Sequence, residues 1–163
     1  MKVMIFLGSD SDFDVIEDGL GVLKGFGVPF SLEVTSAHRS PERTARLIRE
    51  AEAAGAEVFI AVAGKAAHLA GVVAAHTVRP VIGVPVDSDA LAGMDALLST
   101  VQMPKGIPVA TVALGKHGGT NAALLAVQIL ALADEKLNAG LVDHRAKMAA
   151  GVEAASKKLR GKL

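Results

Sequence analysis

The feature that most constrains the fold is a regular alternation of short apolar runs with longer segments of helical periodicity. This alternation is typical of a parallel β-sheet with helices on both faces. Five short β-branched or apolar runs are predicted to be strands, and they cover residues 3–7, 31–35, 58–63, 81–84 and 109–113. The predicted fold class is therefore α/β, a three-layer αβα domain on a parallel sheet.

The segments between these runs carry helix signals. Apolar residues recur at helical spacing in residues 13–26, and Ser40 precedes Pro41 and Glu42 as a capping residue would. That second helix is predicted to end at Gly55. Further helices are predicted over residues 66–76, 119–132 and 135–163. We expect one α/β domain over residues 1–163, with a core of residues 1–134 and a C-terminal helical tail of residues 135–163.

The amino-acid composition limits the classes of function that the chain can have. Lysine plus arginine and aspartate plus glutamate each total 17, so nothing favours binding to long nucleic acids or to an anionic membrane. The chain has no cysteine, which excludes disulfides and thiolate chemistry. The apolar start runs directly into Gly8-Ser9-Asp10 and does not resemble a signal peptide. We expect a cytoplasmic protein that acts on a small molecule.

Polar residues follow the first three predicted strands, at the point where each strand ends. They form the segments Gly8-Ser9-Asp10-Ser11-Asp12, Ser36-Ala37-His38-Arg39 and Gly64-Lys65-Ala66-Ala67-His68. In open α/β sheets, ligands bind outside the carboxyl ends of the strands. The sequence therefore predicts that the three segments meet in one pocket.

Each segment also has a purely structural explanation. Gly8-Ser9-Asp10-Ser11-Asp12 is suited to a turn and a helix cap, and His38 and His68 to hydrogen-bonded structural roles. Arg39 and Lys65 suit solvated surface positions. Neither a P-loop nor a Gly-x-Gly-x-x-Gly motif is present, and the histidines lack metal-ligand spacing. The coincidence of three polar strand ends is what favours a functional site.

The residue types point to a ribonucleotide. Arg39, with nearby serine hydroxyls and loop amides, suits a terminal phosphate. Asp12 can accept hydrogen bonds from ribose hydroxyls. His38 can take up or release a proton near neutral pH. Together these groups suggest a ribonucleotide whose base undergoes proton transfer.

Several blocks of the chain resemble a known family. The three strand-end segments are joined by Ser40-Pro41, Leu69 and, further along, Ser99-Thr100-Val101-Gln102-Met103-Pro104, Gly106-Ile107-Pro108-Val109-Ala110-Thr111 and Asn121-Ala122-Ala123-Leu124-Leu125-Ala126. In this order they resemble the N5-carboxyaminoimidazole ribonucleotide mutases of purine biosynthesis. The resemblance implies a flavodoxin-like fold, a homo-octamer, and no metal or organic cofactor.

The resemblance also implies residue roles. Ser9, Asp12 and Arg39 would bind the nucleotide, and Ser11 and Ser36 would help at its phosphate. His38 would be the catalytic proton carrier. The backbone around Gly64 and Ala66, with His68 and Leu69, would bound the pocket for the migrating carboxylate.

Two residues depart from the usual mutase pattern: Lys65 replaces a glycine and Ala70 replaces a proline. A basic residue near position 65 is more typical of the related carboxylases, which use free carbon dioxide. Lys65 either brings a cation to the pocket or turns into solvent. Direct carboxylation of 5-aminoimidazole ribonucleotide is therefore the alternative activity, and a non-catalytic nucleotide-binding module is a more remote one.

Overall fold

The computed structural model describes residues 1–88 and 90–162. Its contacts divide the chain into two compact units, Met1–Val127 and Gln128–Leu163, and each is described here by itself. Residue 163, the last of the predicted tail, lies outside the described residues. The single domain predicted for residues 1–163 stays a prediction.

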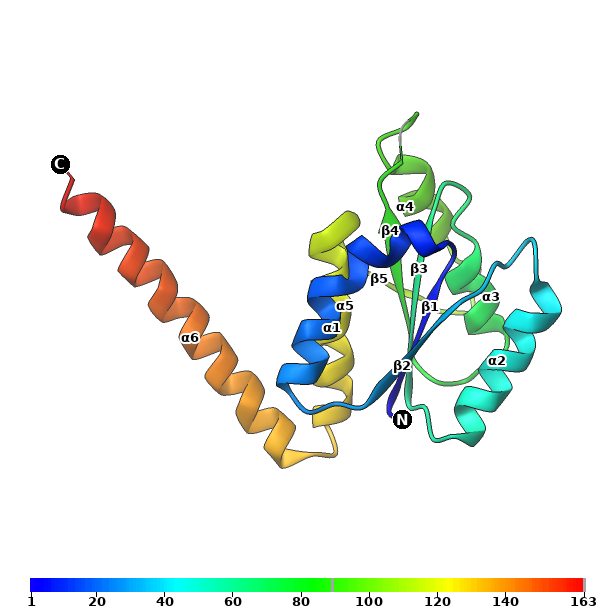
Figure 1. Ribbon diagram of the computed structural model, residues 1–163, viewed down its shortest axis with the longest axis horizontal. Helices are drawn as coiled ribbons and strands as arrows, with labels where there is room; N and C mark the ends of the chain where they lie inside the picture. The colour runs from blue at the N-terminus through cyan, green and yellow to red at the C-terminus, as the bar shows by residue number, and fades with distance from the viewer. Residues whose placement is uncertain (89, 163) are drawn as a thin grey trace. The chain divides into compact units, whose positions relative to one another are not determined.

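The first unit is built on a five-stranded parallel sheet with the order β2-β1-β3-β4-β5 (Figure 1). The chain runs from β1 to one side and then returns to the other, so the strand order reverses between β1 and β3. Ligands bind at such switch points in doubly wound folds. The strands are β1 (Val3–Leu7), β2 (Phe30–Val34), β3 (Val58–Gly64), β4 (Val81–Val86) and β5 (Ala110–Thr111).

Helices cover both faces of this sheet, which confirms the predicted three-layer, flavodoxin-like α/β fold. Figure 1 shows α1 and α5 on one face and α2, α3 and α4 on the other. The helices of this unit are the 3₁₀ helix η1 (Asp10–Asp12), α1 (Phe13–Gly25), α2 (Pro41–Ala53), α3 (Leu69–Ala75), α4 (Met94–Val101) and α5 (Gly115–Ala131), whose last four residues belong to the second unit.

The core lies on both sides of the central strands because every residue of β1 is buried. Phe6 of β1 and Phe59 of β3 stack with their ring centroids 6.1 Å apart, beneath Ile48 of α2 and Val73 of α3. A continuous apolar strand buried on both faces is the usual pattern in parallel sheets. This rigid centre fixes the loops that follow the strands.

Several predicted boundaries were wrong, and the reasons are local. The predicted strand 81–84 continues to Val86, because Pro85 lies beyond the two residues at which β5 pairs with β4 and needs no N–H on that side. The predicted strand 109–113 keeps only Ala110 and Thr111, at the sheet edge. The predicted helix 119–132 begins earlier, at Gly115. Helix α4 was not predicted at all.

One helix start and one helix cap also differ from the predictions. The predicted helix 66–76 begins only at Leu69, because successive bonds of 2.8 Å from the Ala67 and His68 amides to the Lys65 and Ala66 carbonyls form a turn first. Ser40 does precede α2, with Pro41 at its first position, but its side chain does not cap the helix. Its hydroxyl bonds the backbone of Ser36 instead, which closes the loop after β2.

The second unit is dominated by α6 (Glu135–Arg160), in agreement with the helical tail predicted for residues 135–163. Asp134 caps this helix by accepting hydrogen bonds from the amides of Lys136 and Leu137. None of its residues is buried. In the described chain, no helix is both long enough and apolar enough to cross a bilayer.

Candidate active site

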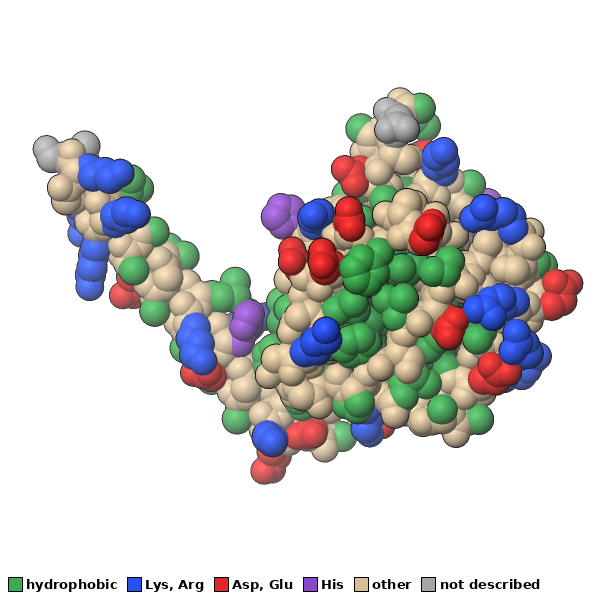
Figure 2. Space-filling view, in the orientation of Figure 1, with side chains coloured by type: hydrophobic (Ala, Val, Ile, Leu, Met, Phe, Trp, Pro, Cys, Tyr) green, Lys and Arg blue, Asp and Glu red, His purple; other side chains and the backbone are tan. Residues whose placement is uncertain are grey.

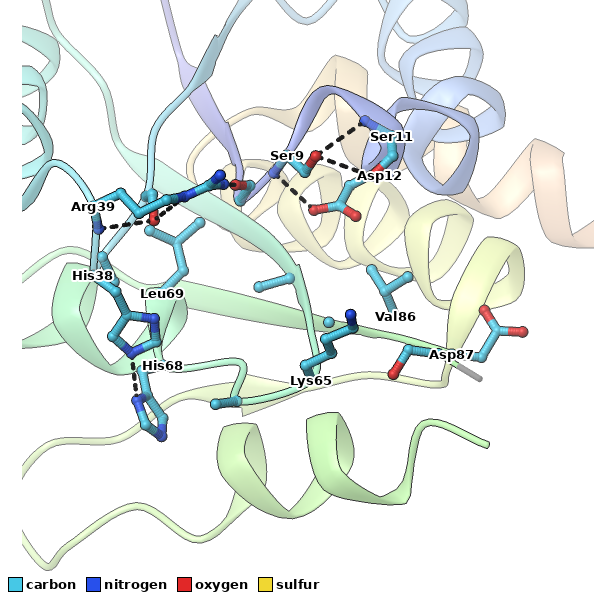
Figure 3. A pocket seen from close by; sticks show the side chains of 17 residues that line it. Ser9, Ser11, Asp12, His38, Arg39, Lys65, His68, Leu69, Val86 and Asp87 are labelled. Carbon is cyan, nitrogen blue, oxygen red and sulfur yellow. Dashed lines mark hydrogen bonds between the residues drawn. The ribbon is translucent and has the colours of Figure 1, made fainter. Parts of the chain in front are cut away.

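A pocket of about 860 Å³ opens at the carboxyl ends of β1, β2, β3 and β4 (Figure 3). The structure brings every predicted site residue to its lining, from three loops that are far apart in sequence. These residues are Ser9, Ser11, Asp12, Ser36, His38, Arg39, Gly64, Lys65, Ala66, His68 and Leu69.

The loop after β1 is held by a reciprocal capping arrangement. The Ser9 amide donates to Asp12 Oδ2 over 3.0 Å, and the Ser11 amide donates to Ser9 Oγ over 3.4 Å. This is the structural role that the sequence allowed for the segment. The same side chains nevertheless line the pocket, so the cap positions two hydroxyls and a carboxylate toward a ligand.

Asp12 is the one strongly buried carboxylate of the pocket, with 7% of its surface exposed. Burial raises the pKa of its carboxyl above the ordinary value, and the nearby Asp10 adds to this effect. The hydrogen bond from the Ser9 amide opposes it. A buried acceptor of this kind favours a ligand that donates hydrogen bonds, as a ribose hydroxyl does.

Arg39 connects the second loop to the first. Its Nη2 donates to the Gly8 carbonyl over 3.3 Å, and its Nε donates to Ser36 Oγ over 3.4 Å. The Arg39 amide donates to the same hydroxyl over 3.1 Å. The guanidinium is therefore oriented beside serine hydroxyls, which is an arrangement suited to a phosphate.

His38 and His68 form a pair across the second and third loops. His38 Nε2 and His68 Nδ1 lie 2.8 Å apart, and the rings meet edge to face. One of the two nitrogens must carry the proton of this bond, so each ring constrains the tautomer of the other. Both side chains are exposed to the pocket, where a ligand atom can exchange a proton with the pair.

Lys65 lies in the third loop and extends into the pocket (Figure 3). Its side chain is also exposed to solvent, so the structure shows Lys65 at the pocket without showing what it binds there. Among the residues described, no cluster of three or more His, Asp or Glu side chains could hold a metal ion.

Sequence reasoning missed the contribution of β4. Val86, the last residue of β4, also lines the pocket, and so do Asp87 and Ser88 directly after it. The strand had been predicted to end at residue 84, so these residues were not recognised as a strand end. The signal was available, because Asp87 and Ser88 repeat the pattern of polar residues after an apolar run.

Comparison with known proteins agrees with this geometry. The model of the AIR carboxylase family matches residues 2–151. The N5-carboxyaminoimidazole ribonucleotide mutase of Methanocaldococcus jannaschii is 50% identical, covering 97% of each chain. The enzyme of the same name from Escherichia coli K12 is also 50% identical, over 88% of this chain and 85% of the relative. The crystal structure of Treponema denticola PurE superposes with a TM-score of 0.88 and 32% identity, over 96% of this chain and 97% of that one.

Proposed function

The chain belongs to the AIR carboxylase family, and from that premise we propose how its pocket performs the family's chemistry. The activity is that of an N5-carboxyaminoimidazole ribonucleotide mutase, an isomerase of purine biosynthesis, as the names of relatives at about 50% identity indicate. The observation that carries the assignment to this pocket is the convergence of the Arg39 guanidinium, the buried Asp12 and the His38–His68 pair in one cavity.

The proposed reaction moves a carboxyl group within one nucleotide. The bond between the exocyclic nitrogen and the carboxyl carbon breaks, and that nitrogen takes up a proton as carbon dioxide forms. The ring carbon then bonds to the trapped carbon dioxide and loses its own proton. The product is 4-carboxy-5-aminoimidazole ribonucleotide, and no proton is gained or lost overall.

We assign the proton transfers to His38. It is the imidazole at the end of β2, and its bond to His68 holds the ring toward the cavity. General acid–base catalysis by a positioned side chain typically contributes about 10²–10⁴-fold. Because one proton leaves the carbon and another enters the nitrogen, a single imidazole that alternates between acid and base is sufficient.

The binding roles follow from the same geometry. Arg39, Ser9, Ser11 and Ser36 would hold the phosphate through charge and hydroxyl donors. Asp12 would accept hydrogen bonds from the ribose. The backbone at Gly64 and Ala66, with His68 and Leu69, would enclose the carboxyl group at the base end of the ligand.

The test compares two substrates with the purified protein. One reaction receives N5-carboxyaminoimidazole ribonucleotide, and the other receives 5-aminoimidazole ribonucleotide with bicarbonate. We expect efficient conversion of the first only. Efficient use of the second alone would make the protein a carboxylase, and saturable binding without turnover of either would make it a non-catalytic binding module.

We also propose that the protein works in the cytoplasm as a homo-octamer. The assembly is supported by apolar surface that the single chain leaves uncovered. Val142, Met148 and Val152 of α6 are each at least 60% exposed. On the first unit, Figure 2 shows hydrophobic side chains gathered over the sheet edge formed by β2.

A further inference from the structure

Lys65 adopts a backbone conformation that its side chain disfavours. Its φ is 56°, in the left-handed region that glycine occupies readily and residues with a Cβ occupy at a cost. Among the described non-glycine residues, only Ala92 shares a positive φ. Strained backbone that persists in a binding site points to a role for the side chain that it positions.

The side chain of Lys65 enters the pocket from a different loop than Arg39. Figure 3 shows Lys65 extending from the end of β3, whereas Arg39 comes from the loop after β2. The Arg39 guanidinium is already held by the Gly8 carbonyl and the Ser36 hydroxyl. Within the described part of the chain, Lys65 forms no ion pair. The pocket therefore contains two cationic side chains, Lys65 and Arg39, which come from different loops.

The position of Lys65 indicates which anion it meets. The turn that starts at Lys65 also carries His68, whose ring bonds His38, the proposed proton carrier. Ligand atoms that exchange protons with His38 must lie beside this turn. The phosphate, by contrast, is best served by the planar Arg39 guanidinium and the serine hydroxyls of the other two loops.

We propose that Lys65 binds the migrating carboxylate and makes the site select carboxylated over uncarboxylated aminoimidazole ribonucleotides. This inference rests on the proposed function, in which substrate and product both carry a carboxylate and a phosphate. Lys65 is then a specificity residue of this chain, at a place where the usual mutase pattern has glycine. Carbon dioxide is neutral, so the Lys65 ammonium loses its ion pair while carbon dioxide is present. The ion pair forms again with the carboxylate of the product.

The experiment measures the affinities of two ligands by titration calorimetry. One is 5-aminoimidazole ribonucleotide, and the other is its 4-carboxy derivative. In Lys65→Met, affinity for the carboxylated ligand should fall by about tenfold to a hundredfold, the usual worth of a charge-assisted contact. Affinity for the uncarboxylated ligand should stay within about twofold. Lys65→Arg should restore much of the selectivity, and Lys105→Met, which removes a surface lysine outside the pocket, should change neither affinity.

A second variant separates the charge from the backbone strain. Lys65→Gly should lose the same selectivity while its melting temperature equals or exceeds that of the wild type, by up to about 4 °C. Ala92→Gly relieves the other positive φ outside the pocket and should leave both affinities unchanged. Selectivity lost with unimpaired stability shows that the strained lysine serves the ligand and not the fold.

The outcomes distinguish this inference from the proposed function. Equal loss of affinity for both ligands in Lys65→Met would place Lys65 at the shared phosphate, and no loss would remove it from the binding site. Either result overturns the inference while wild-type turnover of the carboxyamino substrate still stands. A wild-type protein that binds neither nucleotide would overturn the proposed function and the role of Lys65 together.

Discussion

At the scale of single residues, His38 and Arg39 are adjacent in the chain but have different proposed roles, proton transfer and phosphate binding. His38 bonds His68 of the third loop, whereas Arg39 bonds Gly8 of the first. The strand end thus places an imidazole and a guanidinium against different parts of the pocket. Proton transfer and phosphate binding can therefore be disturbed separately.

His38→Asn should abolish turnover and spare binding. Asparagine retains a hydrogen-bonding group but cannot exchange protons near neutral pH, so turnover should fall by at least about a hundredfold. Ligand affinity, measured by calorimetry, should stay close to that of the wild type. Arg39→Ala is the matched comparison and should weaken binding by about one to two orders of magnitude. Near-normal turnover with a lowered melting temperature in His38→Asn would make His38 a structural residue.

Asp12→Asn should bind ribonucleotide more weakly while gaining stability at neutral pH. Because burial raises the Asp12 pKa, this residue favours the folded state below the ordinary value of 3.8 and loses that contribution as the pH rises through its folded pKa. Asparagine can still accept from the Ser9 amide and carries no charge. Thermal unfolding should show the stability gain at pH 7 and its disappearance under acid conditions. A variant that is less stable at pH 7 would contradict this account.

The site residues were predictable one by one, but their contacts were not. The loops that follow parallel strands meet at the ligand-binding edge of the sheet, which is why the predicted residues of three such loops line one pocket. The bond between His38 and His68 joins residues 30 positions apart and depends on where two loops come to rest. The positive φ of Lys65 was not predicted, although the glycine of the usual mutase pattern at this position is the residue that adopts it most readily.

At the scale of elements, the apolar runs determine the sheet and close helix packing positions the first loop. Helix α1 approaches α5 at Gly19, where an added Cβ would lie 2.5 Å from the Gly119 carbonyl oxygen. The chain of α1 continues directly from η1 and the Ser9–Asp12 cap. The depth at which α1 lies on the sheet therefore affects the phosphate side of the pocket.

Gly19→Ala should destabilise the protein, and Gly21→Ala should stabilise it. Both glycines lie in α1, but nothing lies within 4 Å of a Cβ added at Gly21. Overpacking at Gly19 should cost roughly 1–3 kcal/mol, whereas replacing Gly21 should contribute about 0.5–1 kcal/mol through helix propensity. Denaturant unfolding measures both. Equal stability of the two variants would mean that α1 and α5 are not in close contact.

Elements with a strong periodic signal were predicted, and those that depend on neighbours were not. Strands β1, β3 and β4 are recognisable as apolar runs, and α2 is recognisable by its Ser40-Pro41 start. Helix α4 has eight residues, too few for a clear periodic pattern, and it follows Gly93 with a positive φ of 80°. The turn before α3 depends on the backbone of Lys65, so the helix start was placed too early.

At the scale of the whole molecule, all the residues found to line the pocket belong to the first unit. The second unit adds a helix of 26 residues with no buried side chain. Helices in proteins usually gain most of their stability from tertiary packing. Contacts within one chain therefore form the pocket, but they bury no residue of α6.

Light scattering should show a stable homo-oligomer at micromolar concentration, with a mass of about eight chains of 16.7 kDa each. Obligate interfaces are apolar and commonly bury on the order of 2,000 Å² or more. The exposed apolar residues of α6 would be buried in such an interface. Replacing Val142, Met148 and Val152 with serine should reduce the mass. A wild-type protein that is a stable monomer would refute the octamer.

The most direct test of the account follows the carboxyl carbon itself. N5-carboxyaminoimidazole ribonucleotide labelled at this carbon is converted by the wild-type protein in excess unlabelled bicarbonate, within a single turnover. Because the carbon dioxide is proposed to stay in the pocket between the two bonds, nearly all the label should appear in 4-carboxy-5-aminoimidazole ribonucleotide. Product that carries unlabelled carbon from the bicarbonate would contradict the mutase mechanism, since it would mean that the group is released and recaptured from solution.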